Sequence, residues 1–241
     1  MFQTLLLLSI TAFGDGLSAE QLAAKHVEAI GGKAWAEVKT MKISGDYESF
    51  SNTAPFTIYR KRPGKYRFDH TMIKMPCTRA FDGEKAWWKG PFFGAPEGAF
   101  IPEPQNKVTV LESVFDNALL GWKEKGIKLE SGGMEDFEGT EHHLLVVTYP
   151  DGLKETWYLH PKTFLKSFMI GQTYEYGRPG PLEVFYDDYR KVAGVLMPFY
   201  VEQEWHTRHR LFSIEDIQVN KDVDDSLFVA PEAASKPSEG E

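Results

Sequence analysis

Two arginines stand on a strand face that begins with apolar residues. The segment FTIYRKRPGKYRFDH, residues 56–70, has strand-forming residues on both sides of a Pro-Gly pair, which predicts a β-hairpin. Because side chains alternate between the two faces of a strand, one face of the first arm carries Phe56, Ile58, Arg60 and Arg62. A surface strand places its charges opposite its apolar residues, so two arginines in line with them indicate a special environment.

The histidines and acidic residues form no strong metal-binding or catalytic pattern. His142 and His143 are adjacent, so they face opposite sides of a strand and cannot share a metal ion. His206 and His209 flank a turn near Glu204, where a metal site is conceivable, but histidines at strand ends are usually solvated. The aspartates lack calcium-loop spacing, and no phosphate loop, Gly-x-Ser-x-Gly or His-Glu-x-x-His motif occurs. The sequence therefore predicts no catalytic residue, no metal and no cofactor.

The composition excludes some partners and leaves the single cysteine a structural role. The net charge is −8 and the lysines and arginines are scattered, whereas nucleic-acid binding needs a concentrated basic face. Cys77 is the one cysteine and lies in the strand-like stretch MPCTRAF. Since it has no partner for a disulfide within the chain, it is better explained as a buried structural residue than as a catalytic thiol.

The N-terminus has the pattern of a secretory signal peptide. An apolar run from Leu5 to Phe13 is too short to span a bilayer and is followed by small residues that end near Ala19. No lysine or arginine precedes the run, so an N-terminal strand is the alternative. We expect residues 1–19 to be a signal peptide and the protein to be periplasmic or secreted.

Two helices and one unusual loop interrupt a chain of strands. Apolar residues recur at helical spacing from Glu20 to Ile30 and from Val108 to Trp122. Residues 90–107 are rich in glycine, proline and phenylalanine, which predicts a loop that packs on the protein body or touches a ligand. Residues 230–241 are polar and predict a disordered tail, which leaves 20–229 as a single domain.

About a dozen short strands, joined by short turns, predict one curved antiparallel sheet or barrel. In one of them the apolar phase slips at Glu215-Asp216, which predicts a β-bulge there. Two helices of ~10 Å width each cannot cover so wide a sheet, so the sheet must curl around them or enclose a hollow. The alternative is a hollow filled by the helices and large side chains. Inward-facing residues, the predicted ligand contacts, are Met41, Ile43, Tyr47, Phe68, Met72, Trp157, Val184, Tyr186, Met197, Phe199 and Trp205.

Several short motifs, in order, resemble the periplasmic lipoprotein carrier LolA and its wider superfamily. Lys61-Arg62-Pro63 ends a strand, and Asp82-Gly83-Glu84-Lys85 leads into a strand with Trp87-Trp88. The C-terminal half adds DDYRKVAGVLMPFYVE and an ending with Asn220, Asp224, Phe228 and Pro231. The resemblance covers most of the chain after the signal peptide. It implies a mainly β fold with α, an incomplete antiparallel barrel covered by lid helices.

The resemblance also implies a function and a role for one arginine. The cavity of such a half-barrel takes the acyl chains of a lipid or lipoprotein, in a monomer with membrane-bound donor and acceptor proteins as candidate partners. The Lys-Arg-Pro arginine, here Arg62, bonds to the lid and holds the empty form closed. Helix-end carbonyls suit a guanidinium because they lack partners within the helix. Arg60 is a second candidate for this clasp. The alternative for Arg62 is a solvated position on the rim of the barrel with no role in closure. The lid would include Phe92, Phe93, Leu111, Phe115 and Leu119.

Departures from the family pattern keep two other functions open. The chain is longer than a typical carrier around residues 90–107 and at its tail, and the lysine after Asp-Gly is displaced by one position. An enzyme acting on a hydrophobic small molecule would use inward acid–base candidates, which are Tyr47, Tyr66, His70 and Tyr186. An envelope lipid sensor is the third reading.

Overall fold

The computed structural model describes residues 16–175, 178–205 and 208–235. Strands make up most of the chain, as the sequence predicts. They are β1 (Thr40–Ser49), β2 (Asn52–Lys61), β3 (Lys65–Met72), β4 (Met75–Phe81), β5 (Ala86–Gly90), β6 (Ala95–Phe100), β7 (Lys128–Phe137), β8 (Thr140–Thr148), β9 (Lys154–Leu159), β10 (Lys166–Glu175), β11 (Arg178–Val192), β12 (Val195–Trp205) and β13 (Arg208–Val219).

Short helical segments flank and interrupt these strands. They are α1 (Ala19–Ala29), α2 (Ala34–Glu37), α3 (Lys107–Ser113) and the 3₁₀ turns η1 (Pro91–Phe93), η2 (Asp225–Phe228) and η3 (Glu232–Ser235). None of the helices in the described ranges is long and apolar enough to cross a membrane.

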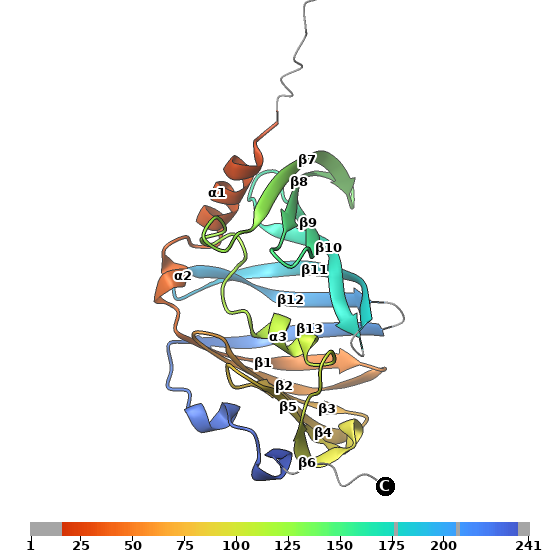
Figure 1. Cartoon of the computed structure of the whole chain (residues 1–241). Helices are drawn as coiled ribbons and strands as arrows, with labels where there is room; N and C mark the ends of the chain where they lie inside the picture. The colour runs from red at the N-terminus through yellow and green to blue at the C-terminus, as the bar shows by residue number, and fades with distance from the viewer. Residues whose placement is uncertain (1–15, 176–177, 206–207, 236–241) are drawn as a thin grey trace, which may run out of the picture.

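The strands form one open antiparallel sheet, which confirms the predicted half-barrel (Figure 1). The sheet order is β6-β5-β4-β3-β2-β1-β13-β12-β11-β10-β9-β8-β7, so β6 and β7 are its two edges. The chain leaves one edge after β6 and re-enters at the other edge with β7. The connection, which includes α3, therefore has to cross the concave face (Figure 1).

The predicted hairpin and bulge are both present. β2 and β3 pair around Pro63-Gly64, with Lys61 opposite Lys65. Between β1 and β13 the register shifts so that Ser44 pairs with Asp216 and Gly45 with Ile214. Gly45 is required there, because a Cβ would lie 2.1 Å from the Ser213 carbonyl oxygen.

The ends of the predicted domain differ from expectation. Ser18 caps α1: its Oγ accepts from the Gln21 N–H at 3.2 Å, and its own N–H donates to Gln21 Oε1 at 2.8 Å. The helix therefore begins before residue 20, while residues 1–15 of the predicted signal peptide lie outside the described residues. Residues 230–235, expected in the tail, include η3, which packs against edge strand β6. The rest of the predicted tail, 236–241, also lies outside the described residues.

The two sheet edges differ in how they are covered. At β6, Pro231 lies so close to Gly98 that a Cβ there would come within 2.9 Å of the proline ring. Strand β7 pairs with β8 alone among the described strands and is exposed along most of its length. It carries Glu130, Glu135 and Asp136. One edge is thus covered by η3, whereas β7 contacts α1 and Leu17 but has no second strand partner among the described residues.

Candidate functional site

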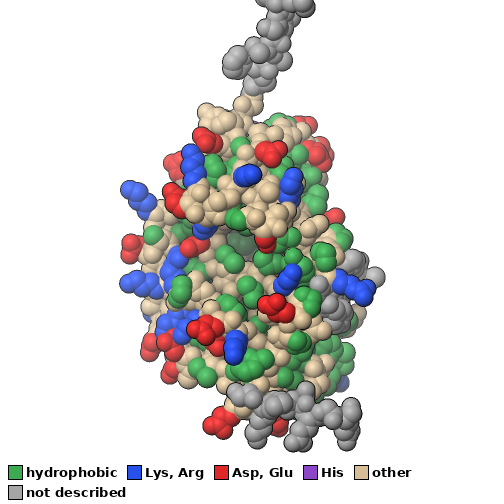
Figure 2. Space-filling model, in the orientation of Figure 1, with side chains coloured by type: hydrophobic (Ala, Val, Ile, Leu, Met, Phe, Trp, Pro, Cys, Tyr) green, Lys and Arg blue, Asp and Glu red, His purple; other side chains and the backbone are tan. Residues whose placement is uncertain are grey.

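A cavity of about 1020 Å³ lies between the concave face of the sheet and the crossing segment that carries α3. Figure 2 shows this face in the orientation of Figure 1, with hydrophobic side chains gathered around a hollow near its centre. The volume is at the upper end of the range for small-molecule sites. The interior is therefore not filled by the helices, which was the alternative that the sequence left open.

Most of the predicted inward residues line this cavity. They are Met41, Ile43, Tyr47, Phe68, Met72, Trp157, Tyr186, Met197 and Trp205. Val184 and Phe199 do not line it: they are 2% and 7% exposed and belong to apolar clusters beside it. Alternation correctly puts both side chains inside, but it cannot tell a cavity wall from the packed core next to it.

The predicted lid residues divide in a similar way. Phe92, Phe93, Leu111 and Phe115 line the cavity. Leu119 packs instead into the apolar cluster under α1. Residues 90–107 are not one loop, because η1 and β6 lie within them.

The predicted long helix from Val108 to Trp122 is wrong, since α3 ends at Ser113. A continued helix would use the carbonyls of Glu112 and Val114 for its own hydrogen bonds. Both carbonyls instead accept from the Arg60 guanidinium, Glu112 O from Nη2 at 2.7 Å and Val114 O from Nη1 at 3.2 Å. Tertiary hydrogen bonds thus replace the last turns of the helix.

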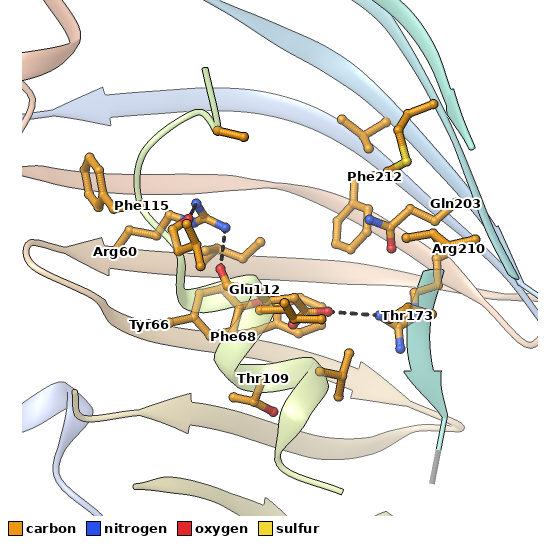
Figure 3. Close-up of a pocket in the computed structure, with 18 of the residues that line it drawn as sticks. Arg60, Tyr66, Phe68, Thr109, Glu112, Phe115, Thr173, Gln203, Arg210 and Phe212 are labelled. Carbon is orange, nitrogen blue, oxygen red and sulfur yellow. Dashed lines mark hydrogen bonds and ion pairs between the residues drawn. The ribbon is translucent and has the colours of Figure 1, made fainter. Parts of the chain in front are cut away.

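Arg60 therefore makes the contact that the sequence analysis assigned to Arg62. It lies on β2, lines the cavity and donates to the C-terminal end of α3 (Figure 3). Carbonyls at a helix C-terminus carry partial negative charge, so a guanidinium is a suitable donor there.

Arg62 lies outside the large cavity, in a smaller recess with Asp116 and Leu120. Its Nη1 and Nη2 donate to both carboxylate oxygens of Asp116, at 2.7 and 2.6 Å. Its Nε donates to Val38 O at 2.6 Å and its Nη2 to Trp35 O at 2.9 Å, both at the end of α2. The guanidinium also lies 4.5 Å from the centre of the Phe115 ring. Arg62 thus joins α2 to the segment that follows α3.

Glu112 on α3 occupies a charged cluster inside the cavity (Figure 3). Its carboxylate forms ion pairs with Arg79 of β4 and with Arg210 of β13, the latter at 3.5 Å. Burial alone would raise the pKa of this carboxyl, but Arg79 and Arg210 hold it below its ordinary value. Glu112 is therefore ionised at neutral pH and ties α3 to two strands from opposite sides of β1.

Two polar atoms at this contact have no hydrogen-bond partner among the described residues. They are Arg79 Nε and Thr109 Oγ1, and the Thr109 residue is fully buried on α3. Leaving a buried polar group unpaired costs free energy. Ion pairs consequently hold α3 against the sheet, but two buried polar atoms at this contact lack hydrogen bonds.

The other end of the cavity contains a lysine. Lys166, the first residue of β10, lies with its Nζ 4.0 Å from the Trp157 ring centre and 4.4 Å from that of Tyr186. His26 of α1 is nearby: its Nδ1 donates to Phe164 O at 2.8 Å, and its Nε2 accepts from Asn117 Nδ2 at 3.1 Å, in the tautomer that satisfies both contacts. These bonds fasten α1 to the turn between β9 and β10 and to the crossing segment.

The acid–base candidates of the enzyme reading do not assemble into a catalytic set. Tyr47 and His70 are in edge contact at 5.4 Å, and Tyr66 lies near Glu112, whereas Tyr186 is beside Lys166. Burial, with Arg79 and Arg210, lowers the pKa of His70 to about 3, and burial raises the pKa of Tyr66. Polar groups do converge near Glu112, but the pKa values of His70 and Tyr66 are both shifted away from neutral pH, where a general acid or base would titrate.

The remaining reactive residues are accounted for by local contacts. Cys77 is buried, and burial raises the pKa of its thiol. His209 Nε2 lies 2.7 Å from Glu202 Oε1, and Glu204 completes a cluster whose ligand atoms lie within 4.8 Å of one another. Both glutamates sit on β12 near its exposed end. His206 lies outside the described residues.

Sequence reasoning missed Glu112, Arg79, Arg210 and Lys166. The signal used for Arg60 and Arg62 would have found two of them. Arg79 lies on the same strand face as Cys77 and Phe81. Arg210 likewise shares a face with Phe212 and Ile214, so each arginine is a charge in line with apolar residues. Glu112 lies on a helix too short to show which face is covered.

Replacing Arg62 with leucine is expected to destabilise the protein by roughly 2 kcal/mol, because the Asp116 carboxylate and two carbonyls lose their donor while water partly replaces it. Urea unfolding measures the change. Arg67→Leu is the matched control, since Arg67 also pairs with an aspartate at similar exposure but contacts η2, not the crossing segment. We expect Arg62→Leu alone to accelerate entry of a fluorescent fatty-acid probe, and equal rates in both variants would make Arg62 a purely structural residue.

Comparison with known proteins finds the same fold in distant structures. No protein-family model matches the chain, and no curated protein sequence matches it. A LolA superfamily protein from Nitrosomonas europaea is 11% identical with a TM-score of 0.57, over 89% of this chain and 98% of the other. A DUF1329 family protein from Desulfovibrio piger is 11% identical with a TM-score of 0.58, over 90% and 98%.

A third structure is a putative outer membrane lipoprotein-sorting protein domain from Vibrio parahaemolyticus. It is 10% identical with a TM-score of 0.56, over 87% of this chain and 95% of the other. At such low identity the likeness establishes the fold alone. The chain therefore has a LolA-like fold, as the sequence motifs predict.

Proposed function

We propose that this LolA-like half-barrel is an exported carrier that holds an acyl chain of a lipid or lipoprotein in its cavity. The observation that carries the proposal is a hollow of about 1020 Å³ walled by methionine and aromatic side chains. Such walls suit a flexible apolar ligand, because methionine adapts its shape and aromatic rings supply large apolar surfaces. The structures with the same fold include one described as a lipoprotein-sorting domain, which supports this class of ligand.

The crossing segment is the element that would move. It closes the cavity through few but strong polar contacts, from Arg60 to the end of α3, from Arg62 to Asp116 and from Glu112 to two arginines. An entering acyl chain would replace the apolar contacts of α3 and favour an open state in which these bonds are released. The ligand can shift the equilibrium toward the open state only by the difference between its binding free energies for the open and closed states.

Export and transfer complete the proposal. Residues 1–19 would direct the chain across the inner membrane, and donor and acceptor proteins in membranes would load and unload it. No covalent chemistry is needed for this function.

Native mass spectrometry of protein purified from a lipid-containing host tests the proposal, because a copurified lipid adds its mass to the folded protein. Displacement of a fluorescent fatty-acid probe then gives the affinity. If no lipid copurifies and no probe binds, the carrier function is wrong.

A cavity-filling substitution is expected to weaken ligand binding without unfolding the protein. Ile43 lines the cavity, so Ile43→Trp should weaken probe binding at least about tenfold, since a bulky indole occupies ligand volume. Ile170→Trp is the control, because Ile170 is 38% exposed and lies outside the cavity wall. Probe titration and thermal unfolding are measured for both. Equal affinities in the two variants would place the probe elsewhere.

A further inference from the structure

The Lys166 ammonium group faces the cavity without an acceptor. Its Nζ lies over two aromatic rings, Trp157 and Tyr186, but among the described residues it donates no hydrogen bond and has no carboxylate within 4.0 Å. A lysine ammonium has three donors, and cation–π contacts satisfy its charge only in part. This end of the cavity thus presents a cation that lacks its hydrogen-bond acceptor.

The carboxylate that acts on Lys166 is already engaged. Glu155 Oε2 accepts from Trp157 Nε1 at 2.6 Å and from the Tyr149 hydroxyl at 3.0 Å. Burial lowers the pKa of Lys166 to about 8, while Glu155 opposes this shift. The lysine is therefore still mostly charged at pH 7, and Glu155 stabilises it from a distance without pairing.

Tyr186 supplies a second donor at the same place. Its ring contacts the Lys166 ammonium, it lines the cavity, and its hydroxyl makes no hydrogen bond within the described part of the chain. Burial, reinforced by Glu155, raises the pKa of Tyr186, so the hydroxyl stays protonated and can donate. The ammonium over the Tyr186 ring and the hydroxyl of the same residue are two donors, each able to bind one oxygen of a carboxylate.

Apolar side chains line much of the cavity between Lys166 and the strands that carry Arg79 and Arg210. In the sheet order, β10 lies three strands from β13, which carries Arg210, and seven strands from β4, which carries Arg79. Cavity residues on the intervening strands include Met197, Ile217 and Ile43, together with the polar Gln203. At roughly 4.8 Å per strand, the path along the sheet to Arg79 is long enough for an extended acyl chain.

The arginine-rich end is the weaker candidate for an anion. Arg79 and Arg210 are paired with Glu112, and Arg60 donates to backbone carbonyls. An anion binding there would have to displace a carboxylate of the protein itself, whereas an anion at Lys166 displaces nothing among the described residues.

We propose that Lys166 and Tyr186 bind the carboxylate of a long-chain fatty acid, whose chain runs along the apolar wall toward α3. This inference rests on the proposed carrier function and names its ligand as a free fatty acid with the head group innermost. A lipid without an anionic head would leave both donors unpaired and would bind less tightly.

The test compares ligands that differ only at the head group. Dodecanoate, dodecanol and dodecyl phosphate compete for a fluorescent probe on wild-type protein, Lys166→Met and Tyr186→Phe. We expect dodecanoate to bind wild type most tightly, and Lys166→Met to weaken it by roughly ten- to hundredfold while dodecanol changes little. Tyr186→Phe should weaken dodecanoate by a smaller factor.

Lys162→Met is the matched control, because Lys162 is exposed on the same β9–β10 turn and carries the same charge. It should leave every affinity unchanged. If Lys166→Met fails to fold, Lys166→Gln provides the same comparison with a polar uncharged side chain.

The outcomes separate the two proposals. If neither dodecanoate nor dodecanol binds wild type, the carrier function itself is wrong. If both bind equally and Lys166→Met changes neither, the carrier function stands and the head-group site is overturned. If dodecyl phosphate binds more tightly than dodecanoate, the assignment to a carboxylate is overturned.

Discussion

Replacing Glu112 with glutamine is expected to lower the free energy of unfolding by about 3–5 kcal/mol, the cost of breaking a buried ion pair from one side. The substitution preserves the shape of the side chain but leaves Arg79 and Arg210 without a counter-charge. Both arginines are mostly buried, with 11% and 16% of their side chains exposed, so water replaces the lost partner only in part. For a protein of this size the loss corresponds to a decrease in melting temperature on the order of 10 °C.

Two further variants make the Glu112 prediction specific. Glu97→Gln is the control, because Glu97 is exposed on β6 and should change stability by less than about 0.5 kcal/mol. The double variant Glu112→Gln, Arg79→Met should be less destabilised than the sum of its single variants, since it removes an unpaired charge. Additive losses would show that Glu112 and Arg79 do not depend on each other.

Acidification is expected to cost about 4 kcal/mol of stability between pH 7.5 and pH 5, through His26 and His70 together. Burial lowers the pKa of His26 to about 4, against the Phe164 hydrogen bond, and lowers that of His70 to about 3. Both are near 6.5 in the unfolded chain, so below pH 6.5 the unfolded state binds more protons than the folded state. Stability is therefore complete above pH 6.5 and falls as pH decreases through this window, by about 2 kcal/mol per histidine at pH 5.

Urea unfolding at several pH values measures this slope. His26→Gln and His70→Gln should each remove a large and similar part of it. The double variant should keep only a small slope between pH 7.5 and 5, because partial burial also lowers the pKa values of His143 and His160. An unchanged slope in the double variant would assign the pH dependence to other groups. Because His26 fastens α1 to Asn117, its protonation would also loosen the crossing segment.

The sheet could be predicted from the sequence because its signals are local. The Pro63-Gly64 turn, the alternation along β2 and the phase slip at Glu215 each lie within about ten residues, and the structure confirms all three. The LolA-like motifs added the prediction of an open half-barrel, which alternation alone does not define. Arg60 and Arg62 alternate in step with Phe56 and Ile58, so the sequence also predicted that they lie on the apolar face of β2.

The crossing segment could not be predicted, because distant residues determine it. An apolar stripe predicts a helix to Trp122, yet Arg60, Arg62 and His26 all bind groups between residues 112 and 117 and end the helix early. Those partners lie on other elements, so no pattern inside the segment reveals them. The same reason hid Lys166, whose surroundings come from β9 and β11.

Strand β7 has no second strand partner among the described residues, and this affects how two copies of the protein would meet. A strand with unpaired N–H and C=O groups can add a strand from another chain, and long exposed edges are starting points for aggregation. Here Glu130, Glu135 and Asp136 would face the same acidic residues of a second copy, so the two edges repel each other at neutral pH. We therefore expect the negative charge on this strand to disfavour edge-to-edge pairing of two copies, whereas η3 obstructs the opposite edge of the sheet.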